Sequence, residues 1–336
     1  MKKMMAFCSA RVKNNNFWTK DGADYPDSYN FLRPLAEALA HKGWACQSSD
    51  TAPAEQCDTA LFVDMPPVDD PYLLAMRRLN RPCFLVILEN YLLKSRNRDY
   101  RRYDEFAKVF SYDDDAVAQG IAIKTNYVHP LPIAIETEDI SQKTKLACMI
   151  FSNSKRTRPR MAYHHRLQTI DFFEKKHPED FDLYGHDWNR GTEIFQTRHP
   201  CLHYRLRHLL LPRFKRTSWR GMVTGKAAIF ARYRFGFCYE NCIEIPGYIT
   251  EKIFDVMMAG SVPVYLGHPA TRNHIPTECY IDRAAFASEA EMYDFLKTMP
   301  DEMYRKYLRA INAFLSSPAS HTFSFEGFVA TVVGVL

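Results

Sequence analysis

Short apolar runs of strand length alternate with amphipathic stretches along the first half of the chain. The predicted strands are Met4–Ala10, Trp44–Cys46, Ala60–Val63, the run CFLVILE at Cys83–Glu89, Ala107–Ser111 and Tyr127–Leu131. Apolar residues three and four positions apart predict helices over Phe31–His41 and Tyr72–Leu79. Parallel strands need crossover connections, which helices usually provide. The alternation therefore predicts a parallel sheet covered by helices.

A polar stretch without apolar periodicity, Glu136–Lys145, separates this half from a second one, and we predict a linker there. The strands predicted after it are Leu146–Ser152, Phe181–Tyr184, Phe235–Glu240 and Val262–Leu266. The predicted helices are Arg160–Lys175, Gly221–Tyr233 and Glu251–Ala259, and the pattern is helical from Ser288 onward. A chain of 336 residues also exceeds the limit of about 250–300 residues for one hydrophobic core. We therefore predict two α/β domains, residues 1–140 and 141–315, and a helical tail, residues 316–336.

Composition and charge narrow the class of protein. With 46% hydrophobic and 25% charged residues, the chain has enough apolar surface to fold, which excludes a disordered protein. The net charge is +5, and basic residues gather at Lys155–Arg160 and Arg205–Arg220. Such patches bind anions or lie in solvated loops. Because aromatic residues are sparse in the second patch and no nucleic-acid-binding motif occurs, we predict no nucleic-acid partner. Salt-sensitive retention of oligonucleotides would revive that alternative.

The nine cysteines form neither a CxxC pair nor a Cys/His zinc spacing. We expect reduced thiols in the cytoplasm, with buried cysteines in the strands at Cys8, Cys83, Cys148 and Cys238. The apolar stretch near the N-terminus is too short for a signal peptide. The terminal run FVATVVGVL is too short to span a bilayer, so packing in the core and peripheral association with the inner membrane both stay open. The oligomeric state also stays open.

Residues 234–267 are the most informative for function, and they predict a strand, a loop, a helix and a second strand. We predict that the Thr250 hydroxyl caps the helix and that Ile249 packs on Phe254 as a hydrophobic staple. Gly260 is placed to end the helix in a left-handed conformation. The helix therefore begins at the carboxyl edge of a parallel sheet, where α/β proteins bind phosphates.

Two charged residues, Glu251 and Lys252, begin this predicted helix. Lys252 can meet a phosphate, whereas Glu251 would repel one and suits hydrogen bonds from hydroxyls such as those of a ribose. The pair therefore indicates a nucleotide rather than bare phosphate. Each residue alone also has an ordinary interpretation, because acidic side chains complement a helix dipole and lysines are usually solvated.

The whole run YENCIEIPGYITEKIFDVMMAGSVPVYLG resembles the donor-binding motif of family 10 glycosyltransferases, the α-1,3/1,4-fucosyltransferases. The matching residues are the pair Glu240 and Asn241, the core Tyr248–Lys252, Asp255 and the Pro-Val-Tyr-Leu-Gly strand. The resemblance implies two Rossmann-like domains that face each other across a cleft, the GT-B architecture. It places GDP-fucose in the C-terminal domain and an oligosaccharide acceptor on the N-terminal domain.

The resemblance also implies which residues bind the donor, namely Asn241, Tyr248, Glu251 and Lys252, and Lys226 in a second stretch of familial sequence. The spacer between Asn241 and Tyr248 is about one residue longer than is typical, a change that a loop tolerates. Ser152 and Asn153, followed by Arg160, resemble the start of the family's donor domain. This places Arg160 on the pyrophosphate, where a guanidinium suits two phosphate oxygens, and Arg156 and Arg158 compete for the same role.

Transfer from GDP-β-L-fucose to an α-linked product inverts the anomeric carbon, so a single displacement needs a base for the acceptor hydroxyl. Glu89 ends the run CFLVILE, and strands of α/β sheets present ligand-facing residues at their carboxyl ends. The segment ILENYLLKSRNRDYRRYDEFAKVFSY resembles the family's Glu-Asn segment, which puts the catalytic glutamate at Glu89. Asp64, which follows the strand LFV, is a rival base.

No cofactor and no metal are expected, because Lys252, Arg160 and helix dipoles can stabilise the charge of the departing GDP. The acidic run Asp113–Asp115 indicates a turn rather than a divalent-cation site. The family implies an acceptor that contains N-acetylglucosamine, such as N-acetyllactosamine, with α-1,3 or α-1,4 linkage. The alternative is an enzyme of the same architecture with another donor, such as GDP-mannose. Since base and donor site lie on different domains, catalysis would require the domains to close.

Overall fold

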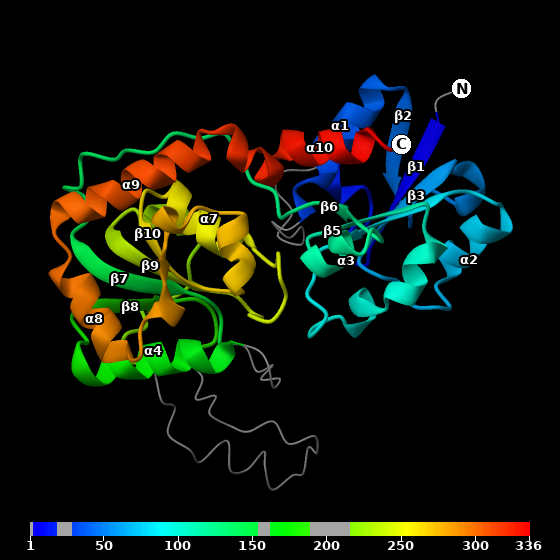
Figure 1. The fold of residues 1–336 in the computed structure, drawn as a ribbon. Helices are drawn as coiled ribbons and strands as arrows, with labels where there is room; N and C mark the ends of the chain where they lie inside the picture. Colours follow the sequence, from blue (N-terminus) through cyan, green and yellow to red (C-terminus); the bar gives the residue numbers. More distant parts are fainter. Residues whose placement is uncertain (1–2, 19–28, 154–161, 189–215) are drawn as a thin grey trace, which may run out of the picture.

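The computed structural model describes residues 3–18, 29–153, 162–188 and 216–336, which form two lobes, each with a central sheet (Figure 1). Both sheets are entirely parallel. The predicted pair of α/β domains is therefore confirmed, and its cause is the regular alternation of strands with crossover helices.

The N-terminal sheet has the strand order β2-β1-β3-β4-β5-β6. Its strands are β1 (Lys3–Cys8), β2 (Trp44–Ser48), β3 (Thr59–Val63), β4 (Cys83–Ile87), β5 (Lys108–Ser111) and β6 (Ile123–Lys124). Successive residues of β1 enter opposite cores: Met5 and Phe7 pack with α1 (Leu32–His41), whereas Ala6 and Cys8 pack with α2 (Pro71–Arg78). This alternation buries both faces of the sheet.

The C-terminal sheet has the order β11-β10-β9-β7-β8. Its strands are β7 (Lys145–Ile150), β8 (Phe181–Tyr184), β9 (Tyr233–Tyr239), β10 (Val262–Leu266) and β11 (Ile281–Asp282). Its helices are α4 (Tyr163–Lys176), α6 (Lys226–Phe230), α7 (Glu251–Met258), α8 (Glu289–Thr298) and α9 (Asp301–Leu315). Helix α4 packs on β8 and α8, whereas α7 packs on β9, β10 and α6.

Two predicted elements are wrong. Tyr127–Leu131 is not a strand, and the sheet ends instead at the short β6. This segment leaves the sheet because it crosses to the second domain, and Pro130 and Pro132 lack the N–H groups that a strand needs. Gly221–Tyr233 is not one helix, since α6 covers only five residues. Gly221 has a φ of +114°, and Gly225 is extended, so the chain cannot be helical there.

The C-terminal tail returns to the first domain. It contains a 3-10 helix, η9 (Pro318–Phe323), and α10 (Phe325–Val333), which lies beside α1 in Figure 1. The Phe328 ring packs on Phe31 with centroids 4.8 Å apart, and Val332 is buried in the same core. One face of the run FVATVVGVL therefore packs in the core of the N-terminal domain, whereas Val335 is exposed. None of the described helices is long and apolar enough to cross a bilayer.

The outgoing and returning segments of the chain are paired where they cross between the domains. The backbone N–H of His129 donates to the carbonyl of Phe323 at 2.7 Å. The Asn126 side chain donates to the carbonyl of Thr322 at 3.2 Å.

The eight cysteines of the described residues are buried and free, and the four expected in strands lie there.

Candidate active site

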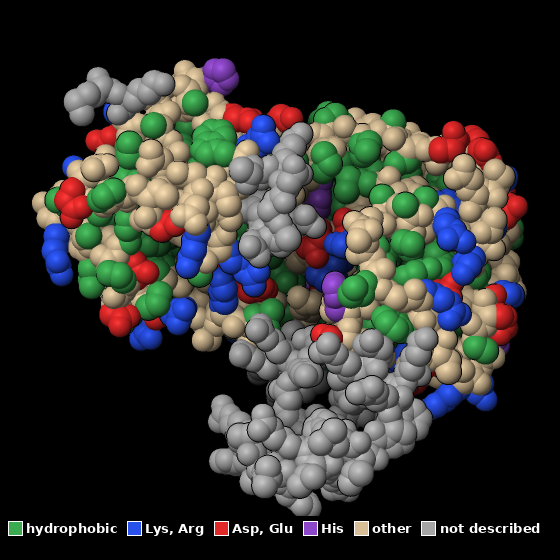
Figure 2. Space-filling view, turned by 180° about the vertical axis from the view of Figure 1, so that it is seen from behind, with side chains coloured by type: hydrophobic (Ala, Val, Ile, Leu, Met, Phe, Trp, Pro, Cys, Tyr) green, Lys and Arg blue, Asp and Glu red, His purple; other side chains and the backbone are tan. Residues whose placement is uncertain are grey.

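A cleft lies between the carboxyl edges of the two sheets, and Figure 2 shows it as a hollow in which acidic and basic side chains gather. It contains two adjoining cavities, of about 500 Å³ and about 440 Å³. The larger one lies mainly on the C-terminal domain, and the smaller one has walls from both domains. Both are lined by Leu93, Lys226, Asn241, Glu251 and Lys252.

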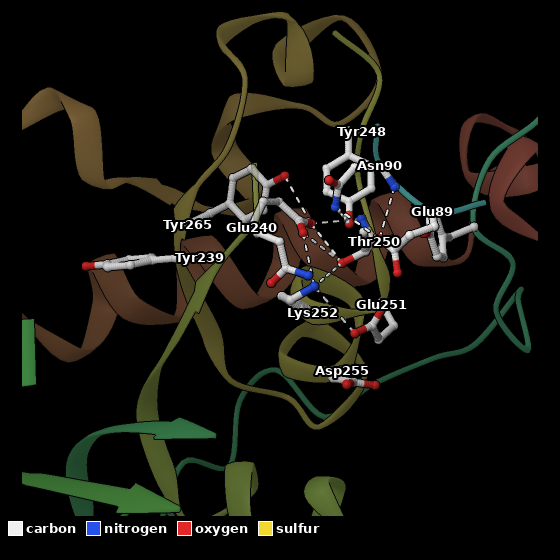
Figure 3. A network of polar contacts seen from close by, with 12 residues as sticks. Glu89, Asn90, Tyr239, Glu240, Tyr248, Thr250, Glu251, Lys252, Asp255 and Tyr265 are labelled. Atoms are coloured by element: carbon white, nitrogen blue, oxygen red, sulfur yellow. Dashed lines mark hydrogen bonds and ion pairs between the residues drawn. The ribbon is translucent and has the colours of Figure 1, made fainter. Parts of the chain in front are cut away.

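The carboxylate of Glu240, directly after β9, organises the C-terminal side of the cleft (Figure 3). It is 0% exposed and accepts hydrogen bonds from the Thr250 backbone N–H at 2.8 Å and from the Thr250 hydroxyl at 2.8 Å. The ammonium of Lys252 lies 3.2 Å away. A buried carboxylate with this many donors is compensated, so Glu240 fixes the start of α7.

The predicted helix cap at Thr250 is wrong. Thr250 does occupy the N-cap position, but its side chain makes no capping hydrogen bond because the hydroxyl is bound to Glu240. Gly260 ends the helix with a φ of +65°, as expected. The buried stripe of α7 consists of Ile253, Phe254, Val256 and Met257. The staple residues Ile249 and Phe254 are both buried in the same core.

Glu251 and Lys252 project into the cleft with their charges close together. Lys252 Nζ lies 3.5 Å from a Glu251 carboxylate oxygen and donates to the Thr250 hydroxyl at 2.7 Å. Burial alone would raise the pKa of Glu251, but the positive charges of Lys252 and Lys226 lower this pKa to about 2. Burial alone would lower the pKa of Lys252, but Glu240 and Glu251 raise it. Both groups therefore stay charged at neutral pH.

Lys226 and Asn241 also face the larger cavity. Lys226 of α6 pairs with Asp255 of α7 at 2.7 Å, so Asp255 orients the ammonium of Lys226. The Asn241 amide oxygen accepts from Arg166 at 3.0 Å, which ties the loop to α4.

Arg166 is a buried cation that sequence reasoning missed. Its guanidinium also donates to the carbonyl of Tyr239 and lines the larger cavity. The signal was present, because Arg166 stands on the apolar stripe of α4 at helical spacing from Tyr163, Ile170 and Phe173. Arg160, with its competitors Arg156 and Arg158, lies outside the described residues.

Glu89 follows β4 on the opposite wall, and it lines the same cavity as Tyr248, Glu251 and Lys252. One carboxylate oxygen, Oε1, accepts from the backbone N–H and from the side-chain amide of Asn90, each at 3.0 Å. Burial raises the pKa of Glu89, and Asp64 adds to this, whereas the Asn90 hydrogen bond and Lys252 oppose it. The structure thus brings Glu89, the predicted base, together with those predicted donor residues that it describes.

The rival base, Asp64, is buried and saturated with donors. Its Oδ1 accepts from the backbone N–H groups of Leu88 and Glu89 at 2.9 and 2.8 Å and from Asn97 at 2.9 Å. Its Oδ2 pairs with Lys94 at 2.6 Å. Since each oxygen is already bound, Asp64 is suited to shaping the loop after β4 rather than to taking a proton.

Tyr248 comes from the C-terminal half of the chain but packs in the core of the N-terminal domain. Its ring centroid lies 5.1 Å from that of Tyr112 and 6.1 Å from that of Tyr127. Its hydroxyl accepts from the Asn90 amide at 3.1 Å (Figure 3). Neither Asn90 nor this docking was predicted.

The acidic run after β5 has a structural role. Asp113 caps α3 (Asp114–Ala118) by accepting from the backbone N–H of Asp115. Asp114 binds Lys124 at 2.6 Å and reaches across to His274 of the C-terminal domain at 2.7 Å. Among the described residues, no three His, Cys, Asp or Glu side chains gather as a metal site.

Taken together, the larger cavity is lined by cations and carboxylates, and the smaller one adds a carboxylate from the other domain. Cations at a helix N-terminus favour phosphate groups. A carboxylate with a raised pKa beside such a site suits general base catalysis. The chemistry available is therefore the binding of a nucleotide-activated group and its transfer to a hydroxyl.

Comparisons with known proteins agree with this chemistry. Residues 215–321 match the family described as "Glycosyltransferase family 10 (fucosyltransferase) C-term". Alpha-(1,3)-fucosyltransferase 7 of Rattus norvegicus is 36% identical over 104 residues, which cover 30% of this chain and 28% of the relative. Alpha-(1,3)-fucosyltransferase FucT of Helicobacter pylori is 29% identical over 75 residues, 22% of this chain and 16% of the relative. GDP-fucose protein O-fucosyltransferase 3 of Gallus gallus is 36% identical over 83 residues, which cover 24% of this chain and 17% of the relative. The matches thus span less than a third of each relative.

Solved structures extend the similarity to the whole fold. The crystal structure of an α1,3-fucosyltransferase with GDP-fucose has a TM-score of 0.56 at 14% identity and covers 99% of this chain and 90% of its own. The crystal structure of Anabaena Alr3699/HepE in complex with UDP-glucose has a TM-score of 0.58 at 12% identity and covers 100% of both chains. The predicted GT-B architecture is confirmed.

Proposed function

Because residues 215–321 match the model of family 10 glycosyltransferases, we propose that the chain transfers fucose from GDP-β-L-fucose to a sugar hydroxyl with inversion. One observation carries the proposal: Glu89 of one domain and Glu251 and Lys252 of the other line a single cavity. This supports a base opposite a nucleotide-diphosphate site, the arrangement that a single displacement requires.

The donor would lie in the larger cavity. Lys252 and Lys226 neutralise the diphosphate, and Glu251, ionised at neutral pH, accepts hydrogen bonds from the ribose hydroxyls. Arg166, buried beneath this wall, adds positive charge and holds Asn241 in place. These cations stabilise the negative charge that develops on GDP, so the reaction proceeds without a divalent metal.

The base acts on the acceptor. Glu89 takes the proton of the acceptor hydroxyl, while the oxygen of that hydroxyl forms a bond with the anomeric carbon. The bond from that carbon to the phosphate oxygen breaks, and GDP leaves with the electron pair. Attack from the face opposite GDP gives the α-linked product. The acceptor is an N-acetylglucosamine-containing glycan such as N-acetyllactosamine, fucosylated in α-1,3 or α-1,4 linkage.

Calorimetry and an acceptor array test the proposal. We expect tighter binding of GDP-fucose than of GDP-mannose, and transfer of fucose to N-acetyllactosamine with EDTA present. NMR of the product should show an α anomer. Preference for GDP-mannose, or a β-linked product, would contradict the proposal, and loss of transfer in EDTA would contradict its metal-free form.

A further inference from the structure

We propose that Asn90 and Tyr248 form a positioning relay for the base, in which Tyr248 orients the Asn90 amide and Asn90 turns one oxygen of Glu89 toward the acceptor. The relay rests on the proposed function, since it takes Glu89 as the base. It gives the Tyr248 hydroxyl a role toward the base in place of the donor-binding role that the family resemblance implies.

Hydrogen bonds fix the side-chain amide of Asn90, which is 0% exposed. Its oxygen accepts from the backbone N–H of Leu93 at 3.2 Å. Its nitrogen donates one hydrogen to Glu89 Oε1 at 3.0 Å and the other to the Tyr248 hydroxyl at 3.1 Å. Each group of the amide therefore has a partner, and the flipped orientation would set its oxygen against the carboxylate.

Both donors of Asn90 that reach Glu89 converge on Oε1. No hydrogen bond to Oε2 occurs among the described residues, so this oxygen is available to an acceptor hydroxyl. The backbone of Glu89 is equally constrained, because its N–H donates to Asp64 at 2.8 Å and its carbonyl accepts from Asn97 at 2.7 Å. The carboxylate thus has one anchored oxygen and one free oxygen.

The anchor depends on the other domain. Tyr248 belongs to the loop between β9 and α7, the same loop that leads into Thr250 and Lys252. This loop sits tightly on the N-terminal domain, because the backbone N–H of Asp114 donates to the carbonyl of Pro246 at 3.1 Å. Gly247, with a φ of +81°, lies so close that an added Cβ would stand 2.2 Å from the carbonyl oxygen of Tyr112. The base is therefore held correctly only while the donor loop is docked.

A double-mutant cycle tests the relay. Asn90→Ala should lower kcat by about 10- to 100-fold, and Tyr248→Phe, which keeps the ring, by about 3- to 10-fold, since a positioned base contributes about 100-fold or more. Because Tyr248 acts through Asn90, the double variant should be no slower than Asn90→Ala. The dissociation constant for GDP should stay within about twofold of wild type in all three.

Tyr304→Phe is the matched control, because it removes a buried phenol hydroxyl that donates to the carbonyl of Arg234, far from Glu89. It should leave kcat unchanged. Multiplying losses in the double variant, or weaker GDP binding by Tyr248→Phe, would place the hydroxyl on the donor and overturn the relay.

A titration without substrate separates the relay from the proposed function. The ¹³C signal of the Glu89 carboxyl should titrate at higher pH in Asn90→Ala than in wild type, because the variant lacks a donor to the charged form. An unchanged titration overturns the relay even if the wild type transfers fucose. Absence of transfer by wild type, with the expected titration, contradicts the function alone. Should Asn90→Ala fail to fold, Tyr248→Phe serves both measurements, with the shift in the same direction.

Discussion

The two sheet edges that form the cleft share one feature, a buried carboxylate, but it has a different role at each edge. Each has a buried carboxylate after a strand, Asp64 after β3 and Glu240 after β9. Each accepts backbone and side-chain donors, and each holds a lysine: Lys94 at 2.6 Å and Lys252 at 3.2 Å. Neither carboxylate has an oxygen left over for catalysis.

The difference lies in what remains for a ligand. Asp64 binds the backbone of Glu89 and pairs closely with Lys94, which is 44% exposed and so partly screened by solvent. Glu240 binds Thr250 and shares Lys252 with Glu251, and Lys252 is only 22% exposed. One edge thus fixes the geometry of the proposed base, whereas the other presents a desolvated cation. The comparison shows that a buried carboxylate can serve orientation or charge, depending on its partners.

The largest effect should come from the residue that Asp64 orients. Glu89→Gln keeps the shape of the side chain but cannot take a proton, so transfer should fall about 1,000-fold or more. GDP binding, measured by calorimetry, should stay within about twofold of wild type. Wild-type turnover in this variant would refute the base assignment.

The next largest effect should be on GDP binding, where the two lysines should differ. Lys252→Ala should weaken GDP binding about 10- to 100-fold, because charge-assisted hydrogen bonds contribute about 1.5–3 kcal/mol. Lys94→Ala, its matched control on the other edge, should change the GDP dissociation constant by less than about twofold. Equal losses would show that the two edges contribute alike to donor binding.

Neutralising the two buried carboxylates should affect different quantities, GDP binding for Glu240 and kcat for Asp64. Glu240→Gln leaves Lys252 without its deepest partner, so GDP binding should weaken about 5- to 10-fold. Asp64→Asn should instead lower kcat by a similar factor of about 5 to 10, with GDP binding retained, because the acceptor that holds the loop of Glu89 loses its negative charge. Melting temperatures of both variants separate these effects from loss of folding. The opposite pattern would reverse the roles of the two edges.

The smallest effect concerns pH. Burial and Asp64 raise the pKa of Glu89, and this proposed base must be deprotonated to act. Activity should therefore be present above this pKa and be lost as pH falls through it, with the acid limb of kcat/KM above the ordinary glutamate value. Glu251, with a pKa of about 2, stays ionised throughout that range and contributes no limb. An acid limb at or below the ordinary value would contradict the raised pKa.

Much of this arrangement could be predicted from local sequence. Apolar runs fixed most strands to within a few residues, and the carboxyl ends of strands located Glu89 and the helix of Glu251 and Lys252. These features follow from periodicity and from the general placement of ligands in α/β sheets. Gly260 was predictable as well, because few other residues adopt its left-handed conformation.

What failed depended on contacts between distant residues. The Thr250 hydroxyl had the right position for a cap, but a buried carboxylate ten residues earlier bound it instead. Tyr127 looked like a strand residue, yet its hydroxyl donates to the carbonyl of Leu88 and its ring meets Tyr248. Likewise, nothing in local pattern places Tyr248 in the core of the opposite domain. These contacts form only with the tertiary structure, and those of Tyr248 require both domains.

The returning tail has a consequence for synthesis of the chain. Phe328 and Val332 complete the core around α1, although some 300 residues separate them from β1. The N-terminal domain therefore cannot finish its core until α10 has left the ribosome. The second domain, whose sheet and α9 end before that segment, can fold earlier. In this protein the order of translation and the order of completion are reversed.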